Sequence, residues 1–418
     1  MKKREIFLVF ALVLFGVIYQ AVEKGKVRFA SDFSFYSDAR KLKGSRFAEF
    51  PEPEKLFANV RKVTIDNPAG EIIINRSDDG QVHLAHFLRV YYADRSDVET
   101  LRQRVRVTAD FNDGELKIAL HYSSPFPYRR LRAHFHLRVP EDTILALSNQ
   151  EGDVIIKDAG KELNISQESG KLFLENIRSR IDLRLRKCNA RLKGIADHVE
   201  IDISHGSISV ESAVSLRLAG RHGDCTVKSI EKDVVIEHAF GKLVLDGAGK
   251  VEIKARHSDI NARNIRDGVA VSDKYGTMTL EYVGGDMRFS GLSSTIDLNH
   301  ASAGSIVVEN AYADTRIRDF SGKNLDVLVK NGNLDLGVTS IADRINIRSQ
   351  HAELKLDFAA LADPTFNIRT KQGRIFIESP LELESYAEKE ERFANRSGQK
   401  PEIFINNTYG DIRVKTTK

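Results

Sequence analysis

The stretch that decides the fold runs Val199-Glu-Ile-Asp-Ile-Ser-His-Gly206-Ser-Ile-Ser-Val210. Apolar and polar residues alternate on both sides of Gly206, and this alternation is typical of strands that bury one face. Numbered from Val199, the unit has apolar residues at positions 1, 3, 10 and 12 and a small residue at position 8. It therefore predicts two short strands that meet at a corner.

The same unit recurs along most of the chain at intervals of 17 to 21 residues. Its copies begin at Leu145, Leu163, Ile181, Val199, Leu216, Val234, Val251, Val269, Met287, Ile306, Leu325, Ile345 and Phe366. A third apolar column stands at position 15, starting with Ala159 and Ile177. Because one unit cannot bury its own apolar face, the units must stack into a continuous core. The sequence predicts an all-β chain whose centre is a right-handed parallel β-solenoid, the hand being that of parallel crossovers in general.

Two outlying copies, Val63–Ile74 and Ile403–Val414, extend the 13 contiguous turns to about 15. Antiparallel strands precede Leu145, with a hairpin at Asn112-Asp-Gly114 and a capping box at Ser96–Glu99 that predicts a short helix. The small residue at position 8 is explained by a corner with positive φ or by close approach of neighbouring turns. The predicted organisation is a membrane anchor or signal at 1–22, a linker at 23–60, a β cap at 61–142, the solenoid at 143–378, an exposed excursion with a helix as one option at 379–401, and a terminal turn at 402–418.

The composition excludes several classes of protein. With 41% hydrophobic and 29% charged residues, the chain is neither disordered nor a multi-span membrane protein. The net charge of +4, from 63 basic and 59 acidic residues, is too balanced for a typical nucleic-acid binder. The 2 cysteines, Cys188 and Cys225, lie two turns apart, about 10 Å along the axis. A disulfide needs Cα atoms within about 7 Å, so we expect two free thiols.

The N-terminal segment Ile6–Val22 carries no charge over 17 positions and follows Lys2, Lys3 and Arg4. This length is at the short end for a spanning helix, so a cleaved signal is an alternative. Bulky Tyr19 and Arg28 stand where a cleavage site needs small residues, which favours an uncleaved anchor. The basic flank predicts that the N-terminus is cytoplasmic and that the remainder of the chain is exported.

At this point the chain resembles the bacterial putative-adhesin family of β-strand repeats, and is similar to head domains of autotransporter adhesins. The resemblance is carried by His136-Leu-Arg-Val-Pro140, by Leu145–Ile156 and by the repeated strand–small–strand units, over roughly residues 60 to 418. It implies a solenoid located in the cell envelope, with the anchor in the bacterial inner membrane and the remainder in the periplasm or outside the cell. The family's function is uncharacterised, and the resemblance supplies no catalytic motif.

The candidate site is a row of rings at position 7, named here the aromatic ladder: His205, His222, Phe240, His257 and Tyr275. Beside it at position 6 stand Arg221, Arg256 and Lys274. Parallel stacking spaces like positions about 5 Å apart. Rings flanked by cations suit sugar faces or an anionic polymer, and the alternative is that the rings only stabilise the corner. His residues without a carboxylate make a poor metal site, so we predict neither a metal nor a cofactor.

The function that these observations favour is a non-catalytic, membrane-anchored envelope solenoid, acting as a scaffold or an adhesin-like binding module. Its expected partners are the membrane and an envelope polysaccharide or protein, and not nucleic acid. One alternative is an enzyme acting on polysaccharide, which requires carboxylates in neighbouring turns; at position 9, Asp153 and Asp224 are four turns apart. Another is a solenoid that assembles end to end through its exposed strands.

Overall fold

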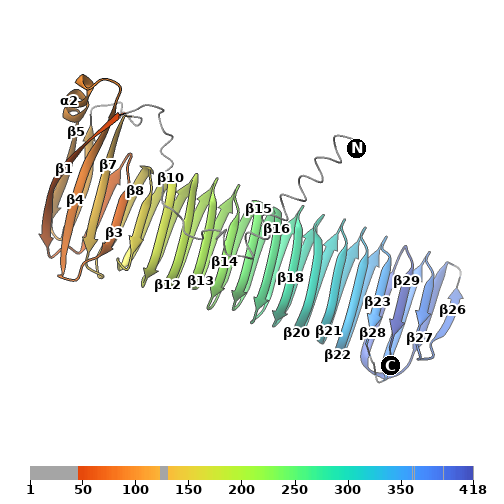
Figure 1. The fold of residues 1–418 in the computed structure, drawn as a ribbon. Helices are drawn as coiled ribbons and strands as arrows, with labels where there is room; N and C mark the ends of the chain where they lie inside the picture. Colours follow the sequence, from red (N-terminus) through yellow and green to blue (C-terminus); the bar gives the residue numbers. More distant parts are fainter. Residues whose placement is uncertain (1–45, 123–129, 360, 362, 389, 418) are drawn as a thin grey trace, which may run out of the picture. The chain divides into compact units, whose positions relative to one another are not determined.

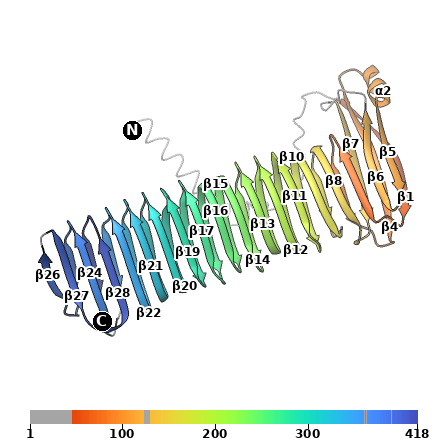
Figure 2. The same cartoon turned by 180° about the vertical axis from the view of Figure 1, so that it is seen from behind.

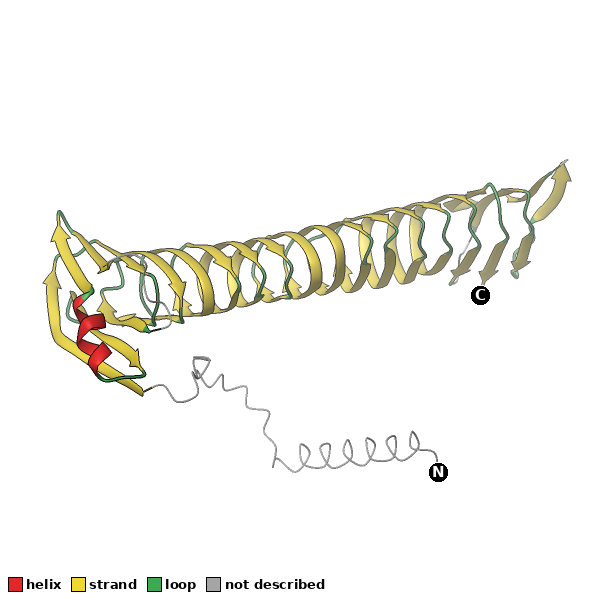
Figure 3. Cartoon of the chain, turned by 90° about the horizontal axis from the view of Figure 1, so that it is seen from above, coloured by secondary structure: helices red, strands yellow, loops and turns green. Residues whose placement is uncertain are grey.

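The computed structural model describes residues 46–417, apart from residues 123–129, 360, 362 and 389. The predicted anchor at 1–22 lies outside these residues, as does the first part of the linker. Within the described ranges, no helix combines the length and the apolar character that crossing a membrane requires. The chain from residue 46 onward is a stack of β-strands with one short helix (Figures 1 and 3).

The centre of the chain is a parallel β-solenoid of about twelve turns. Strands of consecutive units pair in parallel with like positions in register, as where Ile236 faces Ile253 and Val251 faces Val269. These turns are formed by β8 (Ile144–Glu151), β9 (Val154–Lys157), β10 (Glu162–Ile177), β11 (Ile181–Arg186), β12 (Cys188–Ser204), β13 (Ser207–Arg221), β14 (Cys225–Ile230), β15 (Val234–Ala248), β16 (Val251–Ile265), β17 (Val269–Lys274), β18 (Thr277–Gly284), β19 (Met287–Leu292), β20 (Thr295–Ala311), β21 (Thr315–Lys330), β22 (Leu334–Gln350) and β23 (Leu354–Phe358).

The core follows the predicted columns. Every residue of the position 3 column from Leu147 to Ile368 is buried, and so is the position 15 column from Ala159 to Phe320. In the position 12 column only Ile377, in the last turn, is half-buried. The alternating pattern therefore identified the inward face correctly, because a strand buried on one side must place its apolar residues at every second position.

The N-terminal cap is built from β1 (Arg46–Ala58), β2 (Lys62–Asn67), β3 (Ile72–Arg76), β4 (Gln81–Tyr92), α2 (Ser96–Gln103), β5 (Val105–Asn112), β6 (Glu115–Tyr122) and β7 (Leu131–Val139). The linker prediction fails from residue 46 onward, since β1 pairs antiparallel with β4. The predicted helix is present as α2, but its N-cap residue is Arg95 and no side chain caps it. The predicted hairpin joins β5 to β6, with positive φ at Asp113 and Gly114.

At the other end, chain order and spatial order differ. The terminal strands β28 (Gln399–Asn407) and β29 (Ile412–Thr416) do not follow β24 (Pro364–Lys371) and β25 (Ile375–Glu378) as the last turn. Instead, β28 lies between β22 and β24, as Figure 2 shows, and β29 lies between β23 and β25. The stack of His351 on Tyr409, with centroids 4.5 Å apart, marks the same neighbourhood. The contiguous run therefore ends one turn earlier than the thirteen that the repeat predicted.

The excursion predicted at 379–401 is also strand. β26 (Glu384–Glu388) and β27 (Glu391–Arg396) form an antiparallel hairpin, and β27 pairs with β24. The polar and charged composition of this segment is also compatible with an exposed helix, which the sequence left as one option. An edge hairpin with charged side chains satisfies the same composition, and it covers the open edge of the last parallel strand.

The corners explain the small residue at position 8. The positive φ belongs mainly to position 7, for example 55° at His222, rather than to the following glycine. At Gly223 the constraint is space, because a Cβ there would lie 1.6 Å from the carbonyl oxygen of Gly206 in the preceding turn. Of the two explanations offered by the sequence, close approach of neighbouring turns therefore applies at Gly223.

A buried polar column at position 5 was not predicted. Its amides donate inward to corner carbonyls: Asn149 Nδ2 to Gly152 O at 3.1 Å, and Asn407 Nδ2 to Gly410 O at 2.9 Å. Asp273 occupies the same column and is 1% exposed. Its Oδ2 accepts a hydrogen bond from Ser294 Oγ at 2.8 Å, while its Oδ1 has no hydrogen-bond partner.

Asp273→Asn is therefore expected to stabilise the protein at neutral pH. An amide at this place can donate to the Gly276 carbonyl, as Asn149 does to Gly152, so the gain should be about 1 to 3 kcal/mol. Burial raises the pKa of Asp273 above its ordinary value of 3.8, so the folded state keeps the proton to a higher pH than the unfolded state does. The wild type consequently loses stability as the pH rises through that window. Urea unfolding at pH 4 and pH 7.5 should show the difference between variant and wild type only at the higher pH; an equal difference at both would contradict it.

Candidate functional site

The five rings of the aromatic ladder stack face to face at one corner of the solenoid. Successive centroids from His205 to Tyr275 are 4.9, 4.8, 5.1 and 5.0 Å apart, and the interplanar angles are 23°, 6°, 12° and 16°. The structure therefore brings together all five predicted rings, at the spacing that parallel strand pairing imposes. The turns on either side carry Lys187 and Ser293 at this position, so the stack ends there.

The stack leaves ring edges, not ring faces, for a ligand. Each inner ring is covered on both faces by its neighbours, while 44% of Phe240 and 49% of Tyr275 remain exposed. Only the outer faces of His205 and Tyr275 lack a ring partner in the ladder. The expectation that sugar faces stack on these rings is therefore corrected, because the faces that stacking requires are already in contact with other rings.

All five rings occupy a backbone conformation that bulky side chains disfavour. Their φ angles lie between 51° and 66°. For a residue with a Cβ this left-handed conformation costs roughly 1 to 2 kcal/mol, and Gly or Asn adopts it more easily. An aromatic pair contributes about 0.5 to 1.5 kcal/mol beyond its buried area. Stacking in the row thus offsets much of the backbone cost and supports a structural role for the rings.

The cations at position 6 are exposed and stand beside the aromatic ladder. Arg221, Arg256 and Lys274 form no ion pair within the part of the chain that the structure describes. By contrast, Arg186 pairs with Glu168, and Arg263 pairs with Asp246 at 2.7 Å. Because exposed cations without a carboxylate partner keep their donors available, these three can contact an anion that lies beside the rings.

On the far side of the corner, the carboxylates at position 9 support the fold. Asp224 Oδ1 accepts a hydrogen bond from the backbone N–H of Lys242 at 3.0 Å, and Asp259 Oδ1 accepts one from Thr277 Oγ1 at 2.9 Å. Asp153 bonds the backbone of the next turn in the same way. These aspartates therefore link successive turns through Oδ1. The other carboxylate oxygen of each is not used in these bonds.

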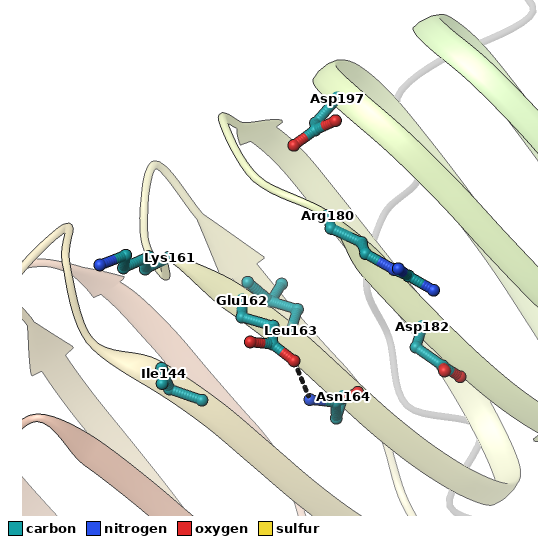
Figure 4. Close-up of a pocket in the computed structure, with 8 residues that line it drawn as sticks. All are labelled: Ile144, Lys161, Glu162, Leu163, Asn164, Arg180, Asp182 and Asp197. Atoms are coloured by element: carbon teal, nitrogen blue, oxygen red, sulfur yellow. Dashed lines mark hydrogen bonds between the residues drawn. The ribbon is translucent and has the colours of Figure 1, made fainter.

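A polar cavity that the sequence did not indicate lies on the outer surface where the first strands of the early units begin (Figure 4). It measures about 500 Å³ and is lined by Ile144, Lys161, Glu162, Leu163, Asn164, Arg180, Asp182 and Asp197. Asp182 faces Glu200 across β11–β12, so carboxylates do occur in neighbouring turns. However, Glu200 is ion-paired with Arg180 at 3.0 Å, and both carboxylates are only half-buried. The pair lacks the apolar surroundings in which enzymes hold a general acid.

The two cysteines are free and buried, as the turn spacing predicted. Burial raises the pKa of Cys188 to about 11 and that of Cys225 to about 12, so neither is a thiolate at neutral pH. Among the described residues, no group of three or more His, Cys, Asp or Glu side chains converges to hold a metal ion. The aromatic ladder and the cations beside it therefore remain the candidate site.

The chain is similar to several known proteins. No curated protein matches the chain significantly. A putative cell adhesion protein from Clostridium sporogenes is 10% identical, with 88% of this chain and 100% of that one covered and a TM-score of 0.17. A putative adhesin from Bacteroides fragilis is 11% identical over 89% and 97%, with a TM-score of 0.18. A putative lipid binding protein from Parabacteroides distasonis is 11% identical over 69% and 97%, with a TM-score of 0.20. The resemblance to a β-strand-repeat family is confirmed by a match to the Toastrack DUF4097 family model over residues 246–415.

Proposed function

We propose that this protein is a non-catalytic binding rod of the bacterial envelope, anchored by its N-terminal segment, and that it binds an anionic polymer beside the aromatic ladder. The observation that carries the proposal is the row of exposed cations, Arg221, Arg256 and Lys274, without ion partners in the described chain and aligned by a rigid stack of rings. The five-ring stack fixes the corner, so cations at its side are held in register along the axis.

The competing functions have weaker support. An enzyme acting on polysaccharide would use Asp182 and Glu200, but the Arg180 ion pair occupies one of these carboxylates. End-to-end assembly needs open strand edges, and the described ends carry the antiparallel strands β1 and β26, the latter with Glu384 and Glu388. Charged edge strands discourage further strand pairing.

The binding test uses paired variants at the ladder. Arg221→Ser with Arg256→Ser should weaken binding of sodium polyuronates by about tenfold or more, which corresponds to about 1.4 kcal/mol. Their melting temperature should not change, since exposed substitutions seldom cost more than about 0.5 kcal/mol. The wild-type affinity should fall with added salt, because exposed charges are screened over about 10 Å at 0.1 M. Calorimetric titration measures the affinity.

A ring variant separates binding from support of the corner. Phe240→Asn keeps a residue that tolerates positive φ but removes two stacking contacts. It should lower the melting temperature while the dependence of binding on salt stays close to that of the wild type. If the arginine variants bind as the wild type does, the ladder is structural only and the binding proposal is wrong.

The anchor proposal rests on the apolar segment Ile6–Val22 and its basic flank. The full-length protein is expected to fractionate with membranes, and N-terminal sequencing should find Met1 or Lys2. Protease added outside, after permeabilisation of an outer membrane where one exists, should cleave in the hairpin at 379–401. A mature N-terminus between Val22 and Phe33 would show that the segment is a cleaved signal and that the protein is secreted. Protection of the hairpin from protease would place the solenoid in the cytoplasm.

A further inference from the structure

The two arginines beside the aromatic ladder stand two turns apart, and Lys274 follows one turn beyond Arg256. Arg221 is in register with Ala239, and Ala239 with Arg256, so the two guanidinium groups stand on every second turn. Two turns correspond to about 10 Å, from the spacing of paired strands. Ser204 precedes Arg221 in the same row. An anion with charges at every turn would therefore face a methyl group where it needs a cation.

The far side of the ladder alternates with the same period. Asp224 follows His222 and Asp259 follows His257, while Lys242 stands in the turn between them. Each aspartate uses Oδ1 within the protein, and both are exposed. Each turn with an arginine on one side of the ring stack thus presents a carboxylate oxygen on the other. Such a surface repels a ligand that is anionic throughout, but it can accept hydroxyl donors.

From this alternation we infer the chemical class of the ligand: an acidic polysaccharide with one carboxylate per disaccharide, lying along the ring edges parallel to the solenoid axis. The inference rests on the proposed function of the ladder. An extended β-linked disaccharide is about as long as two turns, so successive carboxylates meet Arg221 and Arg256. Hydroxyls on the opposite edge of the same sugars donate to Asp224 and Asp259. The covered ring faces exclude stacking of the sugars, so the charge spacing sets the specificity.

The row is bounded at both ends. Lys274 lies one turn beyond Arg256, and the next turn carries Leu292 at this position. In the other direction, Arg186 is engaged by Glu168. The site therefore spans the turns from Ser204 to Lys274, and the longest stretch of polymer that it contacts is about two disaccharides.

The test compares polymers that differ in charge spacing. The full chain in detergent micelles is titrated with sodium hyaluronate, which has one carboxylate per disaccharide, with polygalacturonate, which has one per sugar, with polyphosphate and with uncharged dextran. Per mole of carboxylate or phosphate, hyaluronate should bind about tenfold more tightly than the other two polyanions, and dextran should not bind. Ala239→Arg fills the gap in the row and should shift the preference toward polygalacturonate. Ala239→Ser is the matched control and should leave the order unchanged.

The outcomes separate the two claims. If hyaluronate and polygalacturonate bind equally and both depend on Arg221 and Arg256, the spacing inference is overturned while the proposed function stands. The same conclusion follows if Ala239→Arg increases the affinity for hyaluronate and for polygalacturonate by the same factor. If no polyanion binds, or if binding ignores the arginine variants, the proposed function itself fails. A preference for polyphosphate would also overturn the inference, since Asp224 and Asp259 should repel it.

Discussion

Ile253→Asp is expected to lower the free energy of unfolding by about 4 kcal/mol, through the loss of a well-packed apolar side chain and the burial of an unpaired charge. Ile253 is 1% exposed and lies between Ile236 and Val271 in the inward column of the central turns. Each turn packs only against its neighbours, and this turn is in the middle of the stack. The lost packing therefore cannot be avoided by local unfolding of a terminal turn. Thermal unfolding followed by circular dichroism measures the loss.

The adjacent residue provides the control. Lys254 points outward on the same strand, and Lys254→Ser removes only its exposed pair with Glu252. Its melting curve should superimpose on that of the wild type. Equal damage from both substitutions would show that the inward column is assigned to the wrong face.

Deletion of residues 399–418 is expected to unfold a larger segment than it removes. Among the described strands, β28 and β29 provide the only parallel pairing that joins β24 and β25 to β22 and β23. Without them, the described chain beyond Phe358 loses its attachment to the stack, and the apolar edges of β22 and β23 are exposed. The truncated protein should therefore self-associate, since uncovered strand edges pair with other copies.

Limited proteolysis and sedimentation check this expectation. The truncated chain should be trimmed back to a stable core that ends near Phe358, because nearest-neighbour stacking keeps the earlier turns folded. Arg413→Ser, an exposed change within β29, is the control and should leave the protease pattern unchanged. A truncated chain that still resists protease up to residue 396 would mean that β24 can pair directly with β22.

The strands and the inward columns of the solenoid could be predicted because alternation and burial impose the same period on every turn. The order of the last turns could not. Ile345, Phe366 and Ile403 begin units with the same apolar pattern, so the pattern does not show which of these units are neighbours. Nothing in a single unit specifies its neighbour, and only the structure shows that the Ile403 unit intervenes.

The sequence predicted which residues of the site lie next to one another, but not which parts of their rings are available to a ligand. Register brought His205 to Tyr275 together as expected, yet the sequence did not reveal that stacking would cover the ring faces. The polar column at position 5 was missed because polar residues beside a corner resemble turn residues. Its signal was the recurrence of Asn149, Asn310 and Asn407 at one repeat position, three residues before each corner carbonyl.

Because β28 and β29 lie between two turns that precede them in the sequence, folding of the last turns cannot be completed until these two strands have been synthesised. Turns up to β23 can be added one by one as the chain emerges, since each finds its partner already in place. β24 and β25 have no parallel neighbour until residues 399–416 arrive, so about 40 residues beyond Phe358 remain detached from the stack for several seconds at ordinary rates of synthesis. Residues 399–416 complete the pairing of the last strands. A chain released from a ribosome that stalls before residue 399 would therefore expose the unpaired edges of β22 and β23.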